Sequence, residues 1–256
     1  MSETADIETA SDDYASRFCG PVGAWMLETQ ERAVRTLLGP AAGQTLLDVG
    51  GGHGQLAGPL ASAGWRVTVL GSDASCSRRI EPLVAAGTVT FVAGDVLALP
   101  FPDRSFDAVV SVRLLPHCKR WPELLAELCR VARRAVIVDY PTSESLNRVA
   151  PALFGAKKRL EKNTRTFTLF THREIDAALS GCGFRPTDRI GQFFLPMVLH
   201  RALRCRPCSA ALEAICRVAG LTRRWGSPVM LKARPVEAGS GGQTHRTPAA
   251  TNQPGA

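Results

Sequence analysis

The chain has 256 residues, 45% of them hydrophobic, and a formal net charge of +8. That length and composition can bury a full core, and no apolar stretch approaches the ~20 residues that a membrane span needs. The first residues are acidic and polar, unlike a signal peptide, and eight cysteines without a tight framework suit a reducing compartment. We therefore expect a folded, cytoplasmic protein.

The charge is distributed unevenly along the chain. Residues 1–140 carry 13 Lys and Arg against 16 Asp and Glu, whereas residues 141–256 carry 18 against 7. The basic second half favours an anionic substrate, a lipid surface or a nucleic acid as its neighbour. A solvated basic surface without a partner is an equally good interpretation.

The first elements in chain order are a tail and a helix. Residues 1–11 are polar and lack periodic apolar positions, which predicts disorder. Residues 14–38 have helical spacing, with a break near Gly20 and Pro21, and the helix ends at Gly39 and Pro40.

The next stretch organises the chain. An apolar run over residues 45–49 predicts a buried strand, Gly50, Gly51, Gly52 and Gly54 predict a sharp turn, and residues 55–63 predict a helix. The dinucleotide fingerprint requires a glycine at the sixth position of the turn, where this chain has Gln55. A nicotinamide oxidoreductase is therefore the least favoured of the nucleotide-binding classes.

The pattern Asp48-x-Gly50-x-Gly52-x-Gly54 resembles motif I of the class I S-adenosylmethionine (SAM)-dependent methyltransferases, of the methyltransferase type 11 or ubiquinone/menaquinone methyltransferase-like kind. The resemblance implies that Asp48 and the glycine turn hold the amino-acid end of SAM. A carboxylate beside the turn suits the SAM ammonium, which stands where NAD has a pyrophosphate. It also implies that the leading helix covers SAM through Tyr14, Arg17 and Phe18, although these residues can equally be ordinary packing.

Two further acids follow predicted strands. The strand over residues 66–70 is followed by Gly71, where the family has its ribose-binding acid, and Asp73 comes two residues later. Asp73 is thus a candidate ribose ligand or, equally, a helix cap. After the strand over residues 89–92, the segment with Asp95 and Val96 resembles the part of the family that binds adenine, and we count both among the cofactor-binding residues.

The fourth strand, over residues 105–111, leads to His117. In this family the carboxyl end of that strand faces the transferred methyl group, so His117 is the candidate catalytic base. A positioning or purely structural histidine is the alternative. The segment lacks the Asp/Asn-Pro-Pro-Tyr/Phe signature of amino-directed nucleic-acid methyltransferases.

The second half continues with a helix from Trp121, a strand over residues 135–138, a helix capped by Thr171 and Glu174, a strand from Phe184 to about residue 197, and a last strand over residues 228–232. Two helical insertions are expected, at about residues 145–165 and 200–225. The first has a basic side formed by Lys157, Lys158, Arg159 and Lys162. Such a helix can lie on a membrane or cap a substrate pocket, but it is more often an ordinary surface helix. The second contains Cys205 and Cys208. A zinc site usually has two ligand pairs and only this one is present, so we expect the two cysteines to be free thiols.

Because the long connections are helical, the strands should be parallel and doubly wound. The resemblance extends this to one Rossmann-like domain over residues 12–235, with seven strands, helices on both faces and an antiparallel last strand, followed by a disordered tail at residues 236–256. The expected function is SAM-dependent methylation of a small-molecule or lipid- or quinone-like acceptor, without a metal. An RNA methyltransferase and a SAM-binding protein without catalysis remain as alternatives.

Overall fold

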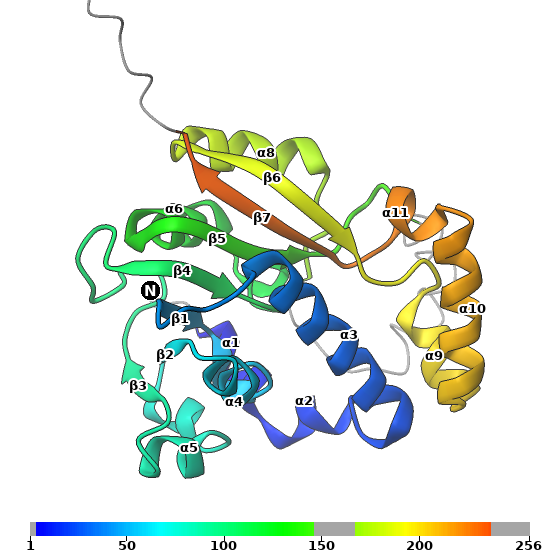
Figure 1. The fold of residues 1–256 in the computed structure, drawn as a ribbon, viewed down its shortest axis with the longest axis horizontal. Coiled ribbons are helices and arrows are strands. Elements are labelled where there is room, and N and C mark those ends of the chain that lie inside the picture. Colours follow the sequence, from blue (N-terminus) through cyan, green and yellow to red (C-terminus); the bar gives the residue numbers. More distant parts are fainter. Residues whose placement is uncertain (1–3, 146–166, 237–256) are drawn as a thin grey trace, which may run out of the picture.

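A computed structural model describes residues 4–145 and 167–236. Its centre is a seven-stranded sheet with the order β3-β2-β1-β4-β5-β7-β6 (Figure 1). The strands are β1 (Thr45–Val49), β2 (Arg66–Gly71), β3 (Thr90–Ala93), β4 (Phe106–Ser111), β5 (Ala132–Tyr140), β6 (Phe184–Gly191) and β7 (Val229–Pro235). Strand β7 is antiparallel to both of its neighbours, and the pairs from β3 to β5 are parallel. This confirms the expected Rossmann-like sheet.

Helices pack on both faces because successive side chains of a buried strand point to opposite sides. On one face, Leu47 and Val109 belong to a core with α6 (Trp121–Val131) and α8 (His172–Gly181). On the other face, Leu46 and Val110 pack with α3 (Gly20–Leu38) and α4 (Ala57–Ser62). One short helix, α5 (Glu81–Ala85), precedes β3. The capping box of Thr171 and Glu174 at the start of α8 is present as predicted.

The N-terminal segment corrects a prediction. Instead of a disordered stretch, the residues before position 12 include the helix α1 (Ala5–Ala10), followed by α2 (Asp12–Ser16). The apolar pattern missed α1 because its buried side chains are polar: Asp6 and Thr9 have exposed fractions of 0% and 3%. The predicted break in the next helix is confirmed, since α2 ends at Ser16 and α3 begins at Gly20.

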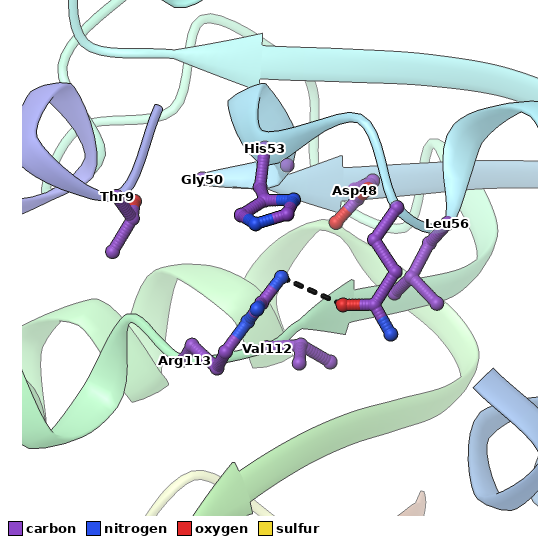
Figure 2. Close-up of a pocket in the computed structure, with 9 residues that line it drawn as sticks. Thr9, Asp48, Gly50, His53, Leu56, Val112 and Arg113 are labelled. Carbon is purple, nitrogen blue, oxygen red and sulfur yellow. Dashed lines mark hydrogen bonds between the residues drawn. The ribbon is translucent and has the colours of Figure 1, made fainter. Parts of the chain in front are cut away.

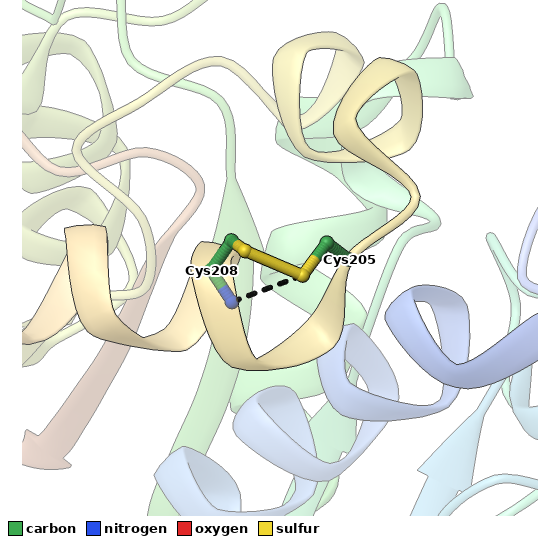
Figure 3. The surroundings of a disulfide bond; sticks show 2 residues. All are labelled: Cys205 and Cys208. Atoms are coloured by element: carbon green, nitrogen blue, oxygen red, sulfur yellow. Dashed lines mark hydrogen bonds between the residues drawn. A yellow bond between two sulfur atoms is a disulfide. The ribbon is translucent and has the colours of Figure 1, made fainter.

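The C-terminal half has two differences from the expectation. Strand β6 ends at Gly191, earlier than predicted, because the chain then leads to a helix that begins at Met197 with Pro196 as its N-cap. The insertion before β7 is helical as expected and consists of α9 (Met197–Leu203), α10 (Arg206–Val218) and α11 (Leu221–Trp225). The expectation of free thiols was wrong, because a disulfide joins Cys205 and Cys208 across the first turn of α10 (Figure 3).

The other predicted insertion, with Lys157, Lys158, Arg159 and Lys162, lies outside the described residues, as does the tail from residue 237. Within the described ranges, no helix combines the length and the apolar character that crossing a bilayer requires.

Candidate functional site

The glycine turn lies at the carboxyl end of β1, between that strand and α4. Gly50 and Gly54 have φ angles of 77° and 78°, in the left-handed region that favours glycine, and flank the short helix η1 (Gly51–His53). A Cβ on Gly51 would lie 2.1 Å from Oδ2 of Asp48, and one on Gly52 would lie 2.7 Å from the carbonyl oxygen of Cys76. The turn therefore needs glycine for its conformation at two positions and for close approach at two others.

Asp48 lies beneath this turn with an exposed fraction of 1%. Its Oδ2 atom has no hydrogen-bond partner among the described residues. Burial raises the pKa of Asp48 to about 7, and the positive charge of Arg113 opposes that rise. A buried carboxyl group with an open acceptor costs stability, which makes Asp48 a strong candidate for ligand binding.

Arg113 faces Asp48 across the site (Figure 2), although it belongs to none of the predicted motifs. It follows β4 with a φ of 63°, and its backbone N–H donates to Oδ1 of Asp139 at 2.6 Å. Figure 2 shows its side chain extending between Asp48 and Thr9, where it donates to Oε1 of Gln55 at 2.6 Å. Its Nη1 atom is buried without a partner within the described parts of the chain. The sequence could have indicated Arg113 as a site residue, because it directly follows a predicted strand whose carboxyl end lies at the same sheet edge as the glycine turn.

His53 completes this group from η1. Neither of its ring nitrogens has a hydrogen-bond partner in residues 4–145 and 167–236. Burial, together with the nearby positive charges of Arg113 and Arg79, lowers the pKa of His53 to about 4. The imidazole is therefore neutral at physiological pH and can accept or donate a hydrogen bond.

The proposed lid residues lie against His53. The ring centres of Tyr14 and Phe18 are 6.0 Å and 5.8 Å from that of His53, both edge-on. The guanidinium carbon of Arg113 lies 5.0 Å from the centre of Phe18, and that of Arg17 lies 5.3 Å from the centre of Tyr14. This arrangement agrees with a segment that covers the site, and the cofactor contacts themselves stay a prediction.

At the end of β2, Asp73 has the cap position that the sequence left as its alternative role. It is exposed and accepts a hydrogen bond from the backbone N–H of Ser75 at 2.8 Å, at the start of η2 (Ala74–Ser77). A hydrogen bond with Ser75 lowers the pKa of Asp73. Position 71 cannot carry an acid without rearrangement, because a Cβ there would lie 2.5 Å from Cβ of Cys76.

A different carboxylate lies at that strand end. Asp6, from α1, accepts hydrogen bonds from the backbone N–H and the hydroxyl of Ser72 at 2.6 Å and 2.5 Å. Sequence reasoning missed Asp6 because it lies in the segment that was predicted to be disordered.

The remaining predicted residues lie apart from this group. Asp95 is exposed and accepts from the backbone N–H of Leu97 at 2.9 Å, whereas the side chain of Val96 is fully buried in the core. His117 ends the short helix η3 (Leu115–His117), with its ring centre 5.6 Å from that of Phe167. The structure thus brings Asp48, Gly50 and Gly51 together with Arg113 and His53 around a cavity of about 10 Å³, and places Asp73, Asp95 and His117 outside its lining.

Comparison with known proteins agrees with this geometry. Residues 47–138 match the model of a family described as "Methyltransferase domain". An uncharacterized methyltransferase of Mycobacterium avium is 45% identical over 93 residues, which are 36% of this chain and 37% of that protein. A demethylmenaquinone methyltransferase of Tropheryma whipplei is 29% identical over 199 residues, covering 68% of this chain and 80% of that protein.

The solved structures agree on the fold. Magnesium protoporphyrin IX methyltransferase from Synechocystis, determined with bound SAH, superposes with a TM-score of 0.60 at 15% identity, covering 90% of this chain and 97% of that one. The matches to the mycobacterial relatives span little more than a third of those proteins. The fold, the glycine turn and these matches confirm the resemblance that the motifs indicated: residues 47–138 form a methyltransferase domain of the class I, SAM-dependent kind.

Proposed function

We propose that this protein binds SAM at the glycine turn and transfers its methyl group to a small, lipid- or quinone-like acceptor. The observation that carries the proposal is a set of buried polar atoms beside the turn that have no hydrogen-bond partner among the described residues. Asp48 offers a carboxylate oxygen, Arg113 a guanidinium nitrogen and His53 two ring nitrogens, none with a partner among the described residues. The carboxylate of Asp48 and the guanidinium of Arg113 have opposite charges, so together they can bind a zwitterionic ligand.

The amino-acid end of SAM is such a zwitterion. In the proposed mode, Asp48 accepts from its ammonium and Arg113 donates to its carboxylate, while the glycine turn allows close backbone approach. Asp95 is the proposed partner of the adenine amino group. When bound, SAM supplies an activated methyl group, so the chain mainly has to hold the acceptor in line and exclude water.

His117 is the proposed base for an acceptor that must lose a proton. Its backbone N–H donates to the carbonyl of Leu114 at 3.0 Å, and the side chain of Leu114 lies within 2.9 Å of the place that a Cβ on Gly50 would occupy. His117 is therefore one short turn from a residue that contacts the glycine turn. Phe167, 60% exposed beside it, offers a flat apolar surface for an aromatic ring.

The function is tested by incubating the protein with radiolabelled SAM and fractionated bacterial extract. We expect label in the lipid fraction, because two relatives of this chain are named as a ubiquinone/menaquinone biosynthesis C-methyltransferase and a demethylmenaquinone methyltransferase. Label in RNA would contradict the proposed acceptor class. Tight SAM binding with no label in any fraction would mean a SAM-binding protein without catalysis.

The affinity for SAM should depend on pH. The pKa of Asp48 is raised to about 7, and only the ionised carboxylate pairs with an ammonium. Below that pH the free site is protonated, so binding at about pH 6 should be roughly tenfold weaker than at about pH 7.5. Calorimetry measures this, with adenosine as the control ligand because it lacks the ammonium. Equal pH dependence for both ligands would argue against the Asp48 contact.

The N-terminal helix should compete with SAM. The cavity of about 10 Å³ is far smaller than the several hundred Å³ that a ligand of this size needs. Helix α1 packs directly on the turn, since a Cβ on Gly52 would lie 3.1 Å from Cβ of Ala10. We therefore expect α1 to move aside, which breaks the hydrogen bonds from Ser72 to Asp6.

Asp6→Ala removes that competing contact and should strengthen SAM binding by roughly tenfold, as expected for the loss of a charged hydrogen bond in the closed form. Calorimetry provides the comparison, and Asp103→Ala is the control because Asp103 is an exposed acid that pairs with Arg130 and lies outside the predicted cofactor site. Weaker binding by Asp6→Ala would instead mean that Asp6 contacts the ribose.

A further inference from the structure

Helix α10 has its apolar side outward. Its fully buried positions are polar, Ser209 and Glu213, whereas Ile215 and Val218 have exposed fractions of 67% and 91%. Glu213 is buried because its carboxylate accepts from the backbone N–H groups of Phe194 and Leu195 at 2.9 Å and 2.8 Å and lies 3.0 Å from Nε2 of His200. These partners satisfy the carboxylate of Glu213 on the buried side of α10, and the apolar side remains at the surface.

The neighbouring helices extend this surface. We call the exposed apolar side chains of α9, α10 and α11 the insertion face: Val198, Leu199, Leu203, Leu212, Ile215, Val218 and Trp225. In α9 and α10 these positions recur at helical spacing, so each helix presents one continuous apolar strip. Figure 1 shows α10 at the edge of the molecule, beyond α9 and α3. So many exposed apolar side chains on three successive helices favour an interaction surface.

The exposed charges that α9, α10 and α11 themselves carry are all positive. Residues 197–225, all of them described, contain a single acid, the buried Glu213. Exposed arginines border the insertion face: Arg204, Arg206, Arg217, Arg223 and Arg224. Arg206 pairs with Glu28 at 2.8 Å, which leaves four that can meet an external anion. The guanidinium of Arg224 also lies 5.4 Å from the ring centre of Trp225.

We propose that the insertion face docks on an anionic lipid bilayer. Apolar side chains with arginine and tryptophan at their border are the features of helices that lie in the plane of a membrane interface. A second copy of the chain is a poor occupant, because a two-fold contact would bring the same arginines together. A nucleic acid would use the arginines and leave Ile215 and Val218 in water.

The insertion face is linked to the candidate site. The guanidinium carbon of Arg201, on α9, lies 5.6 Å from the ring centre of Phe18, and Phe18 lies against His53. A bilayer under α9 and α10 would therefore be close to the segment that covers the glycine turn. This places an acceptor dissolved in the membrane within reach, although the docking surface itself does not depend on methyl transfer.

Vesicle sedimentation at low salt tests the proposal, using the full-length protein without SAM. We expect binding to phosphatidylglycerol vesicles, at least tenfold weaker binding to phosphatidylcholine vesicles, and weakening with added salt. The double variant Ile215→Asp, Val218→Asp and the double variant Arg217→Glu, Arg223→Glu should each bind at least tenfold more weakly. Matched controls are Val236→Asp, an exposed apolar residue, and Arg66→Glu, an exposed arginine, which should bind like the wild type.

Several results would overturn the proposal. A wild type that ignores anionic vesicles, or apolar variants that bind them normally, would remove the insertion face from membrane contact. A dimer that Ile215→Asp converts to a monomer would assign the face to a second copy. Binding to an RNA oligomer that survives Ile215→Asp would assign the arginines to a polyanion. Because the assay contains no SAM, its failure leaves the proposed methyl transfer untouched, and calorimetry with SAM tests that separately.

Discussion

Asp48→Asn should weaken SAM binding by about 10²–10³-fold while leaving the fold intact. The substitution keeps the shape of the side chain and removes the negative charge that the ammonium needs, and the loss of one partner from a buried ion pair costs about 3–5 kcal/mol. The buried Arg113 would then face the ligand without a compensating carboxylate on the protein, which adds to the effect. Calorimetric titration with SAM measures the affinity.

The same substitution should not lower stability at neutral pH. The pKa of Asp48 is about 7 in the folded protein and 3.8 for an ordinary exposed aspartate, so between these pH values the folded protein holds a proton that the unfolded chain releases. The contribution of Asp48 to the free energy of unfolding is therefore fully present below about pH 3.8 and is lost as the pH rises towards 7. At about pH 7.5 the ionised, buried carboxylate destabilises the fold, and Asp48→Asn should melt at the wild-type temperature or higher.

Asp107→Asn is the matched control for this experiment. Asp107 is also a buried acid of the central sheet, with an exposed fraction of 7%, but it lies at the start of β4. Its carboxylate accepts from the backbone N–H and the hydroxyl of Thr45, both at 3.0 Å, and pairs with Arg133 at 3.1 Å. This variant should lose stability and keep its SAM affinity. The reverse pattern in the two variants would refute the assignment of the glycine turn as the cofactor site.

The sheet was predictable because its signal is local. Central parallel strands are buried on both faces, so they are short apolar runs, and the glycine turn after β1 stands out by composition. The apolar residues Leu46 and Leu47 indicate a buried strand whatever the conformation of the rest of the chain. The break before α3 was predictable for a similar reason, since Pro21 is tolerated only in the first turn of a helix.

The site was only partly predictable because much of it is assembled by tertiary contacts. Asp6 is buried by a hydrogen bond to Ser72, 66 positions away, and no periodic pattern announces such a contact. Arg113 enters the site through a left-handed backbone conformation, which a non-glycine residue does not signal in advance. The buried and exposed sides of α10 were not predictable either, because Glu213 is buried by accepting hydrogen bonds from Phe194 and Leu195, which precede the insertion.

His117→Ala should lower turnover by about 10²–10⁴-fold if the acceptor loses a proton to this side chain, with SAM affinity unchanged. The residue lies on η3, after the strand end that leads to Arg113, and borders the exposed ring of Phe167. The rate is measured as label transfer to the acceptor in the lipid fraction. A loss in kcat with little change in KM for the acceptor would indicate a role in the chemical step.

Rescue distinguishes a base from a structural histidine. Added imidazole should restore part of the activity of His117→Ala, because a small base can occupy the space that the side chain leaves. His172→Ala is the matched control, because Nδ1 of His172 is hydrogen-bonded to the hydroxyl of Tyr140 at 2.7 Å. The loss of this side chain should lower stability, and added imidazole should not restore activity. Near-normal turnover in His117→Ala, or a loss that imidazole does not relieve, would assign His117 to packing beside Phe167 and indicate an acceptor that needs no base.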